Sequence, residues 1–230
     1  MEKVMDYCAI FGASGTLGNA IVTEIELSGS TAIKISRDHS DSNYLSTSNA
    51  NWVNEIKSFK NVTGFVWTQG LNKSDSIVNF DINEFNDHIQ ANVGYILETI
   101  HKMLANSAIQ PGARLVIVSS IWQDYAKAQK LSYITSKSAL RGLVSSLAID
   151  LAKLNIAVNA VLPGVIESPM TRKNLTKSQV DFVVQETPMG KLATPENVAK
   201  TVKWLASENS IGITGQFITV DNGWSRYRNV

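Results

Sequence analysis

Residues 7–22, YCAIFGASGTLGNAIV, contain the turn that decides the fold. A short apolar run at residues 7–11 passes at once into a turn rich in glycine, after which apolar residues recur at helical spacing. The order of strand, glycine turn and helix is typical of the first unit of a parallel sheet that binds nucleotides. Glycines let backbone amides approach a ligand closely, and the positive end of the helix favours a phosphate group. A tight turn without a ligand is the alternative interpretation.

A second predicted strand, residues 31–35, closes the first unit and is followed by Ser36 and Arg37. An acidic residue at this place would hold the 2′-hydroxyl of an adenosine ribose, whereas an arginine accommodates a 2′-phosphate. Position 36 carries no acid, so the sequence favours NADP(H) over NAD(H) as cofactor. Asp38 is a competing ribose ligand, and a solvated surface charge is the alternative role of Arg37. The cofactor-binding residues predicted from this unit are Gly12, Ser14, Gly15, Thr16, Leu17, Gly18, Ser36 and Arg37.

Strands and helices alternate along the rest of the chain. Residues 40–51 are polar and predict a loop with at most a short strand around Tyr44 and Leu45. Elsewhere apolar runs bounded by glycine or proline predict strands, and helical periodicity predicts helices. We therefore expect an α/β fold, a Rossmann-like doubly wound parallel sheet with helices on both faces. The predicted strands are residues 64–67, 115–118, 157–162 and 216–220, and the predicted helices are residues 53–59, 85–105, 131–151, 177–185 and 195–206.

The size and composition predict one compact domain over residues 1–230. A formal net charge of +1 and 44% hydrophobic residues suit a single sizeable core. Charged residues make up 18%, and lysines and arginines form no run, so nucleic acid and membrane surfaces are not expected as partners. No apolar run approaches the ~18 residues of a membrane span, and residues 1–7 lack the apolar core of a signal peptide. We expect a cytoplasmic protein.

The chain offers few residues for disulfide or metal chemistry. Cys8 is the one cysteine, lies in the first predicted strand, and is expected to be a small buried hydrophobe. His39, His88 and His101 lack the spacing of metal ligands, so no metal site is expected.

Residues 120–137, SIWQDYAKAQKLSYITSK, predict a catalytic site. Tyr133 and Lys137 are four residues apart in a predicted helix, so they should lie on one face, one turn apart. The ammonium of Lys137 would favour the phenolate of Tyr133, which would lower the tyrosine pKa and make it an acid or base near neutrality. Ser120 ends the apolar run of the strand at 115–118, where its hydroxyl would meet Tyr133. An ordinary surface pair on a helix is the alternative.

With these residues the chain resembles the short-chain dehydrogenases/reductases over nearly its whole length. The most specific match is Ser120 together with the run YITSK at residues 133–137. The run VNAVLPGVIES at residues 158–168 and the run GQFITVD at residues 215–221 match the family as well. Three such matches in one chain are hard to obtain by chance.

The resemblance implies a role for each matching residue. Tyr133 would be the general acid/base, Ser120 would orient the substrate carbonyl, and Lys137 would bind a ribose while lowering the tyrosine pKa. Asn92, inside the predicted helix 85–105, would be the fourth catalytic residue, because in relatives an asparagine there steadies a helix kink and a water that relays protons. The remaining implied cofactor residues are Gly70 and, around the nicotinamide carboxamide, Pro163, Gly164, Val165, Ile166 and Ser168.

Two motifs depart from the family pattern. The usual glycines stand at the places of residues 12, 16 and 18, whereas this chain has Thr16 and carries a glycine at 15. That spacing is seen in other branches of the superfamily, and phosphate binding should survive it. Residues 67–70, WTQG, stand where relatives have Asn-Asn-Ala-Gly, so only the glycine is kept, and the contacts on the adenosine side are not fixed by the resemblance.

We predict a short-chain oxidoreductase that transfers a hydride between NADP(H) and a small-molecule carbonyl or secondary alcohol. A nucleotide-binding scaffold or sensor without turnover is one alternative, and a sugar-nucleotide epimerase or dehydratase, suggested by the glycine spacing, is another. Relatives commonly pair through the helix that carries Tyr133, and its apolar continuation predicts a homo-oligomer, a tetramer or a dimer. The residues that could line an apolar substrate pocket, or simply pack in the core or an interface, are Trp122, Tyr125, Met170, Phe182 and Met189.

Overall fold

The structure is a computed structural model that describes residues 7–37, 41–207, 210 and 212–226. Within these residues seven parallel strands form one sheet, in the order β3-β2-β1-β4-β5-β6-β7. This confirms the predicted α/β fold with a doubly wound, Rossmann-like parallel sheet. The strands are β1 (Tyr7–Phe11), β2 (Thr31–Ser36), β3 (Leu45–Ser46), β4 (Val62–Trp67), β5 (Arg114–Val118), β6 (Ala157–Pro163) and β7 (Phe217–Val220).

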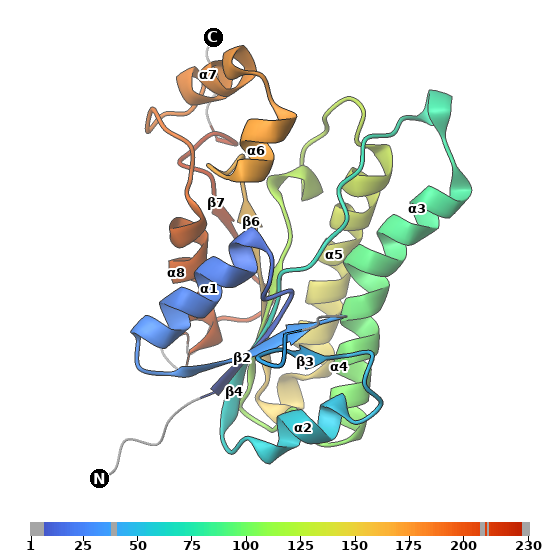
Figure 1. Cartoon of the computed structure of the whole chain (residues 1–230), viewed down its shortest axis with the longest axis vertical. Coiled ribbons are helices and arrows are strands. Elements are labelled where there is room, and N and C mark those ends of the chain that lie inside the picture. Colours follow the sequence, from blue (N-terminus) through green and yellow to red (C-terminus); the bar gives the residue numbers. More distant parts are fainter. Residues whose placement is uncertain (1–6, 38–40, 208–209, 211, 227–230) are drawn as a thin grey trace.

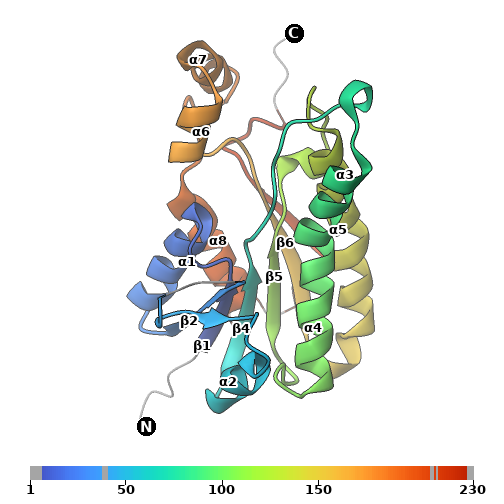
Figure 2. The same cartoon turned by 45° about the vertical axis from the view of Figure 1, so that its right-hand side comes forward.

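Helices cover both faces of this sheet (Figures 1 and 2). Helices α1 (Thr16–Leu27) and α8 (Pro195–Ala206) pack against each other on one face. The other face is covered by α2 (Trp52–Ser58), α3 (Ile82–Ile89), α4 (Tyr95–Ala105) and α5 (Leu131–Asp150). Two short helices, α6 (Pro169–Asn174) and α7 (Lys177–Gln185), stand beyond the carboxyl ends of the strands, at the top of Figure 1.

Alternating residues of the strands supply two separate cores, one under each helical layer. In β1, Ala9 and Phe11 pack with α2, α4 and α5, whereas Cys8 and Ile10 pack with α1 and α8. Both sides of each central strand are therefore buried, which explains why the strands read as continuous apolar runs. Cys8 is buried as expected, and this burial raises the pKa of its thiol to about 12, so it stays protonated.

The predicted elements agree with the structure to within about two residues at each end, apart from the start of one helix and a few short helices. The helix expected at residues 85–105 begins at Ile82, because the Asp81 carboxylate caps it by accepting from the amides of Asn83 and Glu84. A π-helical turn, η2 (Gln90–Gly94), interrupts it before α4 begins. Helix α6 was not expected, since its six residues are too few to show a periodicity. The competing ribose ligand Asp38 lies outside the described residues.

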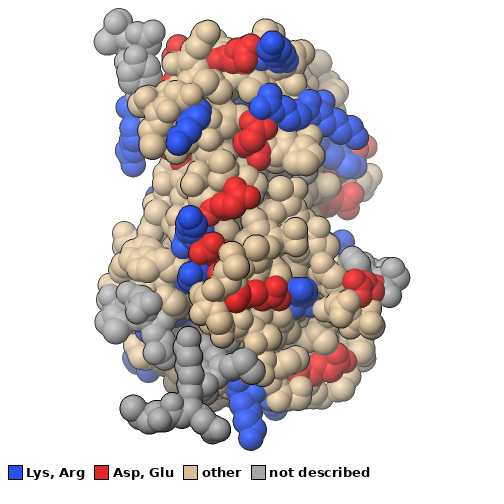
Figure 3. Space-filling model, turned by 60° about the vertical axis from the view of Figure 1, so that its left-hand side comes forward, with Lys and Arg blue, Asp and Glu red and all other residues tan. Residues whose placement is uncertain are grey.

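Charged side chains of both signs are interspersed on the face shown in Figure 3. Among the described residues, no helix is long and apolar enough to cross a membrane.

Candidate active site

The glycine turn places backbone amides at the start of α1. Gly12 has a φ of +80°, and a Cβ there would lie 2.7 Å from the Thr68 hydroxyl and 2.8 Å from the Gln69 nitrogen. A Cβ on Gly18 would overlap the carbonyl oxygen of Gly12, so α1 can begin this close to β1 only without a side chain. The amides of Gly12 and Ala13 donate to the Ile35 carbonyl, which ties the turn to β2. The glycines at 12 and 18 are therefore sterically required.

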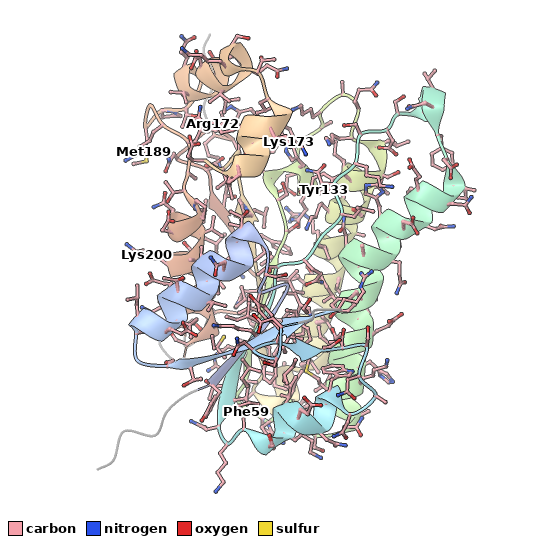
Figure 4. All side chains as sticks on the ribbon, viewed as in Figure 1. Phe59, Tyr133, Arg172, Lys173, Met189 and Lys200 are labelled. Atoms are coloured by element: carbon pink, nitrogen blue, oxygen red, sulfur yellow. The ribbon has the colours of Figure 1, made fainter. Side chains whose placement is uncertain are left out.

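Ser120 and Tyr133 meet at the carboxyl end of β5. Ser120 follows the strand and caps the short helix η3 (Ile121–Gln123), where its hydroxyl accepts from the Trp122 amide at 3.3 Å. Its side chain also interacts with the phenol of Tyr133, which projects from the first turn of α5, and this interaction opposes the rise in the phenol pKa that burial causes. Figure 4 shows Tyr133 near the upper end of α5, across from the helix α6 that carries Arg172 and Lys173. The sequence expectation that strand and helix bring these hydroxyls together agrees with this geometry.

Lys137 is a buried cation rather than part of a surface pair. Its side chain is 4% exposed, its Nζ donates to the Val118 carbonyl at 3.2 Å, and the same Nζ lies 5.9 Å from the ring centroid of Tyr133. Burial lowers the pKa of Lys137 from 10.5 to about 8. The ammonium is thus retained at neutral pH but is poised to exchange a proton.

The expected downward shift of the Tyr133 pKa is wrong for this structure. Burial raises the phenol pKa above its usual value, and the interaction with Ser120 only partly offsets that rise. The physical reason is that the loss of hydration destabilises the phenolate by more than the interaction with Ser120 stabilises it. At neutral pH the phenol of Tyr133 therefore keeps its proton.

Asn92 sits in the π-helical turn η2 and is completely buried. Its Oδ1 accepts from the Leu71 amide at 2.6 Å, and its Nδ2 donates to the Leu71 carbonyl at 3.0 Å and to the Ser136 hydroxyl at 2.8 Å. One side chain thereby joins the segment after β4 to α5. The Asn92 side chain therefore belongs to the interior of the protein and not to its solvent-exposed surface.

Gly70 and Gly164 permit two close approaches around this group. A Cβ at Gly70 would lie 3.1 Å from the Asn92 Oδ1 and 3.5 Å from the Lys137 Nζ. A Cβ at Gly164 would lie 2.5 Å from the Cβ of Asp221, beside β7. Ser168 has a structural task as well, because its hydroxyl accepts from the Thr171 amide at 3.1 Å and so caps α6.

One cavity of about 770 Å³ collects most of the predicted site. Asn92 and Lys137 are not on its wall and stand behind it. Ser36 and Arg37 are not on its wall either: Ser36 is buried, and the exposed Arg37 places its guanidinium 5.5 Å from the ring centroid of Tyr95. The predicted residues on the cavity wall are Gly12, Ser14, Gly15, Thr16, Leu17, Gly18, Gly70, Ser120, Tyr133, Pro163, Gly164, Val165, Ile166 and Ser168.

The chain is similar in sequence and in fold to known proteins. A protein-family profile described as "Enoyl-(Acyl carrier protein) reductase" matches residues 19–225. The chain is 32% identical to the 3-oxoacyl-(acyl-carrier-protein) reductase FabG of Rickettsia typhi, over 93% of this chain and 94% of the relative. The crystal structure of a short chain dehydrogenase family protein from Francisella tularensis covers 97% of this chain and all of its own, with a TM-score of 0.82 and 27% identity.

The chain belongs to the short-chain dehydrogenase/reductase family. The ligand-free aldohexose dehydrogenase of Thermoplasma acidophilum is also similar, with a TM-score of 0.83 and 27% identity over 98% of this chain and 96% of that one. As a family member the chain is an NAD(P)-dependent oxidoreductase.

The cavity of this short-chain dehydrogenase/reductase fits a dinucleotide on two structural grounds. The turn at Gly12 and Gly18 is a cradle that a Cβ would fill, and it lies at the start of a helix, where backbone amides favour phosphate. Both amide atoms of Gln69, which lines the cavity, are buried and have no hydrogen-bond partner among the described residues. A polar ligand bound next to the glycine turn would supply the hydrogen bonds that the buried Gln69 amide lacks.

Sequence reasoning missed some residues that shape the site. Asp75 is buried and accepts from the amide and the hydroxyl of Ser132, next to Tyr133, so it fixes the start of α5. Trp224 lies against Trp122 near the cavity, a position that only the fold of the last turn reveals. Met189 is 62% exposed and is not among the residues that line either cavity near Tyr133, so its place in a substrate pocket stays a prediction. The side chain of Met170 lies outside the described part.

We predict that Lys137→Met changes how stability depends on pH. The pKa of Lys137 is depressed in the fold, so the unfolded chain binds this proton more tightly, and the parent gains stability as pH rises from about 8 to about 10.5. Methionine lacks the titration. The free energy of unfolding of the variant relative to the parent should therefore fall by about 2 kcal/mol between pH 7 and pH 10.

Denaturant unfolding at several pH values measures this difference. Lys153→Met, which replaces an exposed lysine, provides the matched control and should show little change with pH. A difference for Lys137→Met that stays constant across this range would contradict the lowered pKa.

Proposed function

We propose that this enzyme transfers a hydride between NADP(H) and a carbonyl or secondary alcohol, with Tyr133 as the general acid/base. The observation that carries the proposal is that Ser120 and Tyr133 interact on the wall of the cavity that also contains the glycine turn. Two hydroxyls that converge on one point can both reach a single carbonyl oxygen.

The residues have separate tasks in the reduction direction. A bound dinucleotide supplies a hydride from C4 of its nicotinamide to the carbonyl carbon. Ser120 hydrogen-bonds the carbonyl oxygen and stabilises the negative charge that develops there. Tyr133 gives its phenolic proton to that oxygen, so the product is a neutral alcohol. Lys137 lies beside the Tyr133 ring and would bind a ribose. Asn92 holds α5 through its hydrogen bond to Ser136 and so keeps Tyr133 in place.

The raised pKa of Tyr133 suits the acid role, because the phenol carries its proton throughout the neutral range. In the oxidation direction the same group must be ionised to accept a proton. Oxidation should therefore accelerate with rising pH over the range in which reduction is insensitive to pH.

We predict that Tyr133→Phe nearly abolishes the chemical step while leaving the fold and cofactor binding intact. The substitution removes one oxygen and keeps the ring that packs on α5. General acid/base catalysis contributes roughly 10²–10⁴-fold, so single-turnover hydride transfer at saturating NADPH should fall by at least about 100-fold. Stopped-flow loss of NADPH absorbance measures the rate, and an unchanged dissociation constant for NADPH is the control.

Retention of more than about a tenth of the parent rate would exclude Tyr133 as the proton donor. A parent protein that binds NADPH but reduces no member of a panel of ketones, acyl thioesters and sugar derivatives would instead favour the scaffold alternative. Redox-neutral conversion of a nucleotide sugar would favour the epimerase or dehydratase.

The preference for NADP(H) rests on the end of β2. Arg37 follows the buried Ser36, and its guanidinium packs on Tyr95, whose hydroxyl is in turn hydrogen-bonded to Thr47 at 3.0 Å. The Arg37 carbonyl accepts from the hydroxyls of Ser46 and Ser48, which fixes the backbone at this point. A positioned, exposed guanidinium just past β2 is suited to a 2′-phosphate.

We predict that NADPH binds more tightly than NADH, by about 1–3 kcal/mol, and that Arg37→Ala removes most of this difference. The variant should lose affinity for NADPH and keep its affinity for NADH, which lacks the 2′-phosphate and is the internal control. Fluorescence titration of both cofactors measures the four dissociation constants. Equal or tighter binding of NADH by the parent would rule out the NADP(H) preference.

Gln69 is a further residue that we assign to cofactor binding. It stands where relatives have alanine, its backbone packs against Gly12, and its buried amide is unpartnered among the described residues. An unsatisfied buried amide lowers stability, and that cost is recovered when a ligand supplies the missing hydrogen bonds.

We predict opposite effects of Gln69→Leu on stability and on binding. Leucine has a similar size and needs no hydrogen bonds, so the free energy of unfolding without cofactor should rise by about 1 kcal/mol. The dissociation constant for NADPH should increase by about 3- to 10-fold, because a hydrogen bond of this kind contributes about 1 kcal/mol. Denaturant unfolding and calorimetric titration measure the two quantities. Gln185→Leu, at an exposed position of α7, is the control, and unchanged NADPH affinity in Gln69→Leu would refute the assignment.

The oligomeric state and the location of the protein are also proposals. We propose a homo-oligomer, a tetramer or a dimer, and exposed apolar side chains on two helices of one face support it: Leu97 on α4 and Ile149 on α5. A cytoplasmic location stays a prediction. One relative is named for a 3-oxoacyl substrate and another for an aldohexose, so the substrate has to be argued from this chain's own pocket.

A further inference from the structure

A second cavity, of about 710 Å³, adjoins the catalytic cavity. Its volume lies in the ~300–1,000 Å³ range of small-molecule sites. Because the two cavities share wall residues, a molecule whose carbonyl reaches Ser120 and Tyr133 can extend its remainder into the second one. The shared residues are Trp122, Lys127, Val165, Leu175 and Gln179.

Four aromatic side chains line this second cavity, which we name the aromatic subsite: Trp122, Tyr125, Phe182 and Trp224. Trp224 is at the centre of the group, with its ring edge-on to Trp122 at 5.7 Å and to Tyr125 at 6.5 Å between centroids. Rings tilted in this way present both faces and edges to a ligand, which suits offset and edge-to-face packing of another ring. Phe182 on α7 is 61% exposed, and covering it with an apolar ligand would be favourable.

Hydrogen bonds hold this wall in place before any ligand binds. The Asp221 carboxylate accepts from the amide of Gly223 at 2.9 Å and from that of Ser225 at 2.7 Å, which fixes the turn that presents Trp224. The Tyr125 hydroxyl donates to the Ser225 carbonyl at 2.7 Å and joins this turn to the segment after β5. A pre-organised wall loses little conformational freedom when a ligand packs on it.

The polar side chains of the aromatic subsite are too few for a polyhydroxylated ligand. They are Lys127, Ser178, Gln179 and Glu186. Gln179 also caps α7 by accepting from the Thr176 amide, and the Lys127 ammonium lies over the Trp122 ring at 5.9 Å. Each hydroxyl buried without a partner would lower affinity, whereas an apolar ring gains from every aromatic contact.

We propose that the substrate is a ketone or secondary alcohol with an apolar ring body, which packs in the aromatic subsite against Trp224. The proposal rests on the proposed function, because the carbonyl must reach Ser120 and Tyr133. Trp224 then determines specificity without taking part in the chemistry.

The test compares three carbonyl compounds at saturating NADPH: 2-tetralone, 2-butanone and dihydroxyacetone. We expect kcat/KM for 2-tetralone to exceed that for dihydroxyacetone by at least about 100-fold, since even a single methylene in an apolar pocket is worth roughly 10-fold or more. Trp224→Ala should lower kcat/KM for 2-tetralone by about 10- to 100-fold and change that for 2-butanone by less than about threefold. A preference for dihydroxyacetone, or equal losses for 2-tetralone and 2-butanone, would overturn the proposal.

A binding measurement separates this proposal from the proposed function. Calorimetric titration of 2-tetralol into the NADPH complex involves no turnover, and Trp224→Ala should weaken its affinity by about 10-fold, with Trp224→Phe intermediate. Trp204→Ala, at a half-exposed site on α8 outside the described cavities, is the matched control and should leave the affinity unchanged.

If no carbonyl is reduced but 2-tetralol binding still depends on Trp224, the aromatic subsite stands and the proposed function fails. If carbonyls are reduced but Trp224→Ala leaves the affinity for 2-tetralol unchanged, the assignment of the aromatic subsite is wrong and the proposed function stands. Trp224→Phe keeps an aromatic ring in the turn, so a folding defect in the alanine variant would not obscure the outcome.

Discussion

The three hydrogen bonds of the Asn92 side chain are the interaction on which the candidate site depends. The segment after β4 and α5 are not joined by strand pairing, and Asn92 connects them deep in the interior while Asp75 connects them at the start of α5. Burying an amide side chain lowers stability unless all its donors and acceptors are hydrogen-bonded. Here the oxygen of the Asn92 amide is bonded to Leu71, in the segment after β4, and the nitrogen to Leu71 and to Ser136 on α5. The π-helical turn around Asn92 aims the side chain inward, in agreement with the general occurrence of such turns at functional sites.

The parallel sheet supplies the second constraint, since it collects distant residues at one edge. Gly12, Ser120 and Gly164 follow β1, β5 and β6, and all three line one cavity. This convergence was predictable, because parallel strands flanked by helices must all end on the same side. The spacing of Tyr133 and Lys137 was equally readable, because four residues make about one helical turn.

Other features could not be read from the sequence for identifiable physical reasons. The nearby Lys137 predicts a lowered pKa for Tyr133, but burial raises that pKa instead. The burial depends on how the segments at the carboxyl ends of the strands pack together, which the sequence does not show. The Gln69 amide, which has no hydrogen-bond partner in the described part of the chain, and the position of Trp224 both depend on tertiary contacts that leave no periodic signal in the sequence. Helix α3 begins three residues before the apolar spacing indicates, because the Asp81 carboxylate caps its first turn.

The strand order also bears on how the chain reaches this structure. β1 pairs with β4, so Cys8 lies beside Gly64, while β2 and β3 lie on the other side of β1. The loop that closes this pair includes the whole first βαβ unit, and its entropy must be lost before the central contact forms. Sheets dominated by such distant pairings fold slowly compared with helical bundles. Forming the centre of the sheet therefore costs more loop-closure entropy than forming the glycine turn, whose contacts are local in sequence.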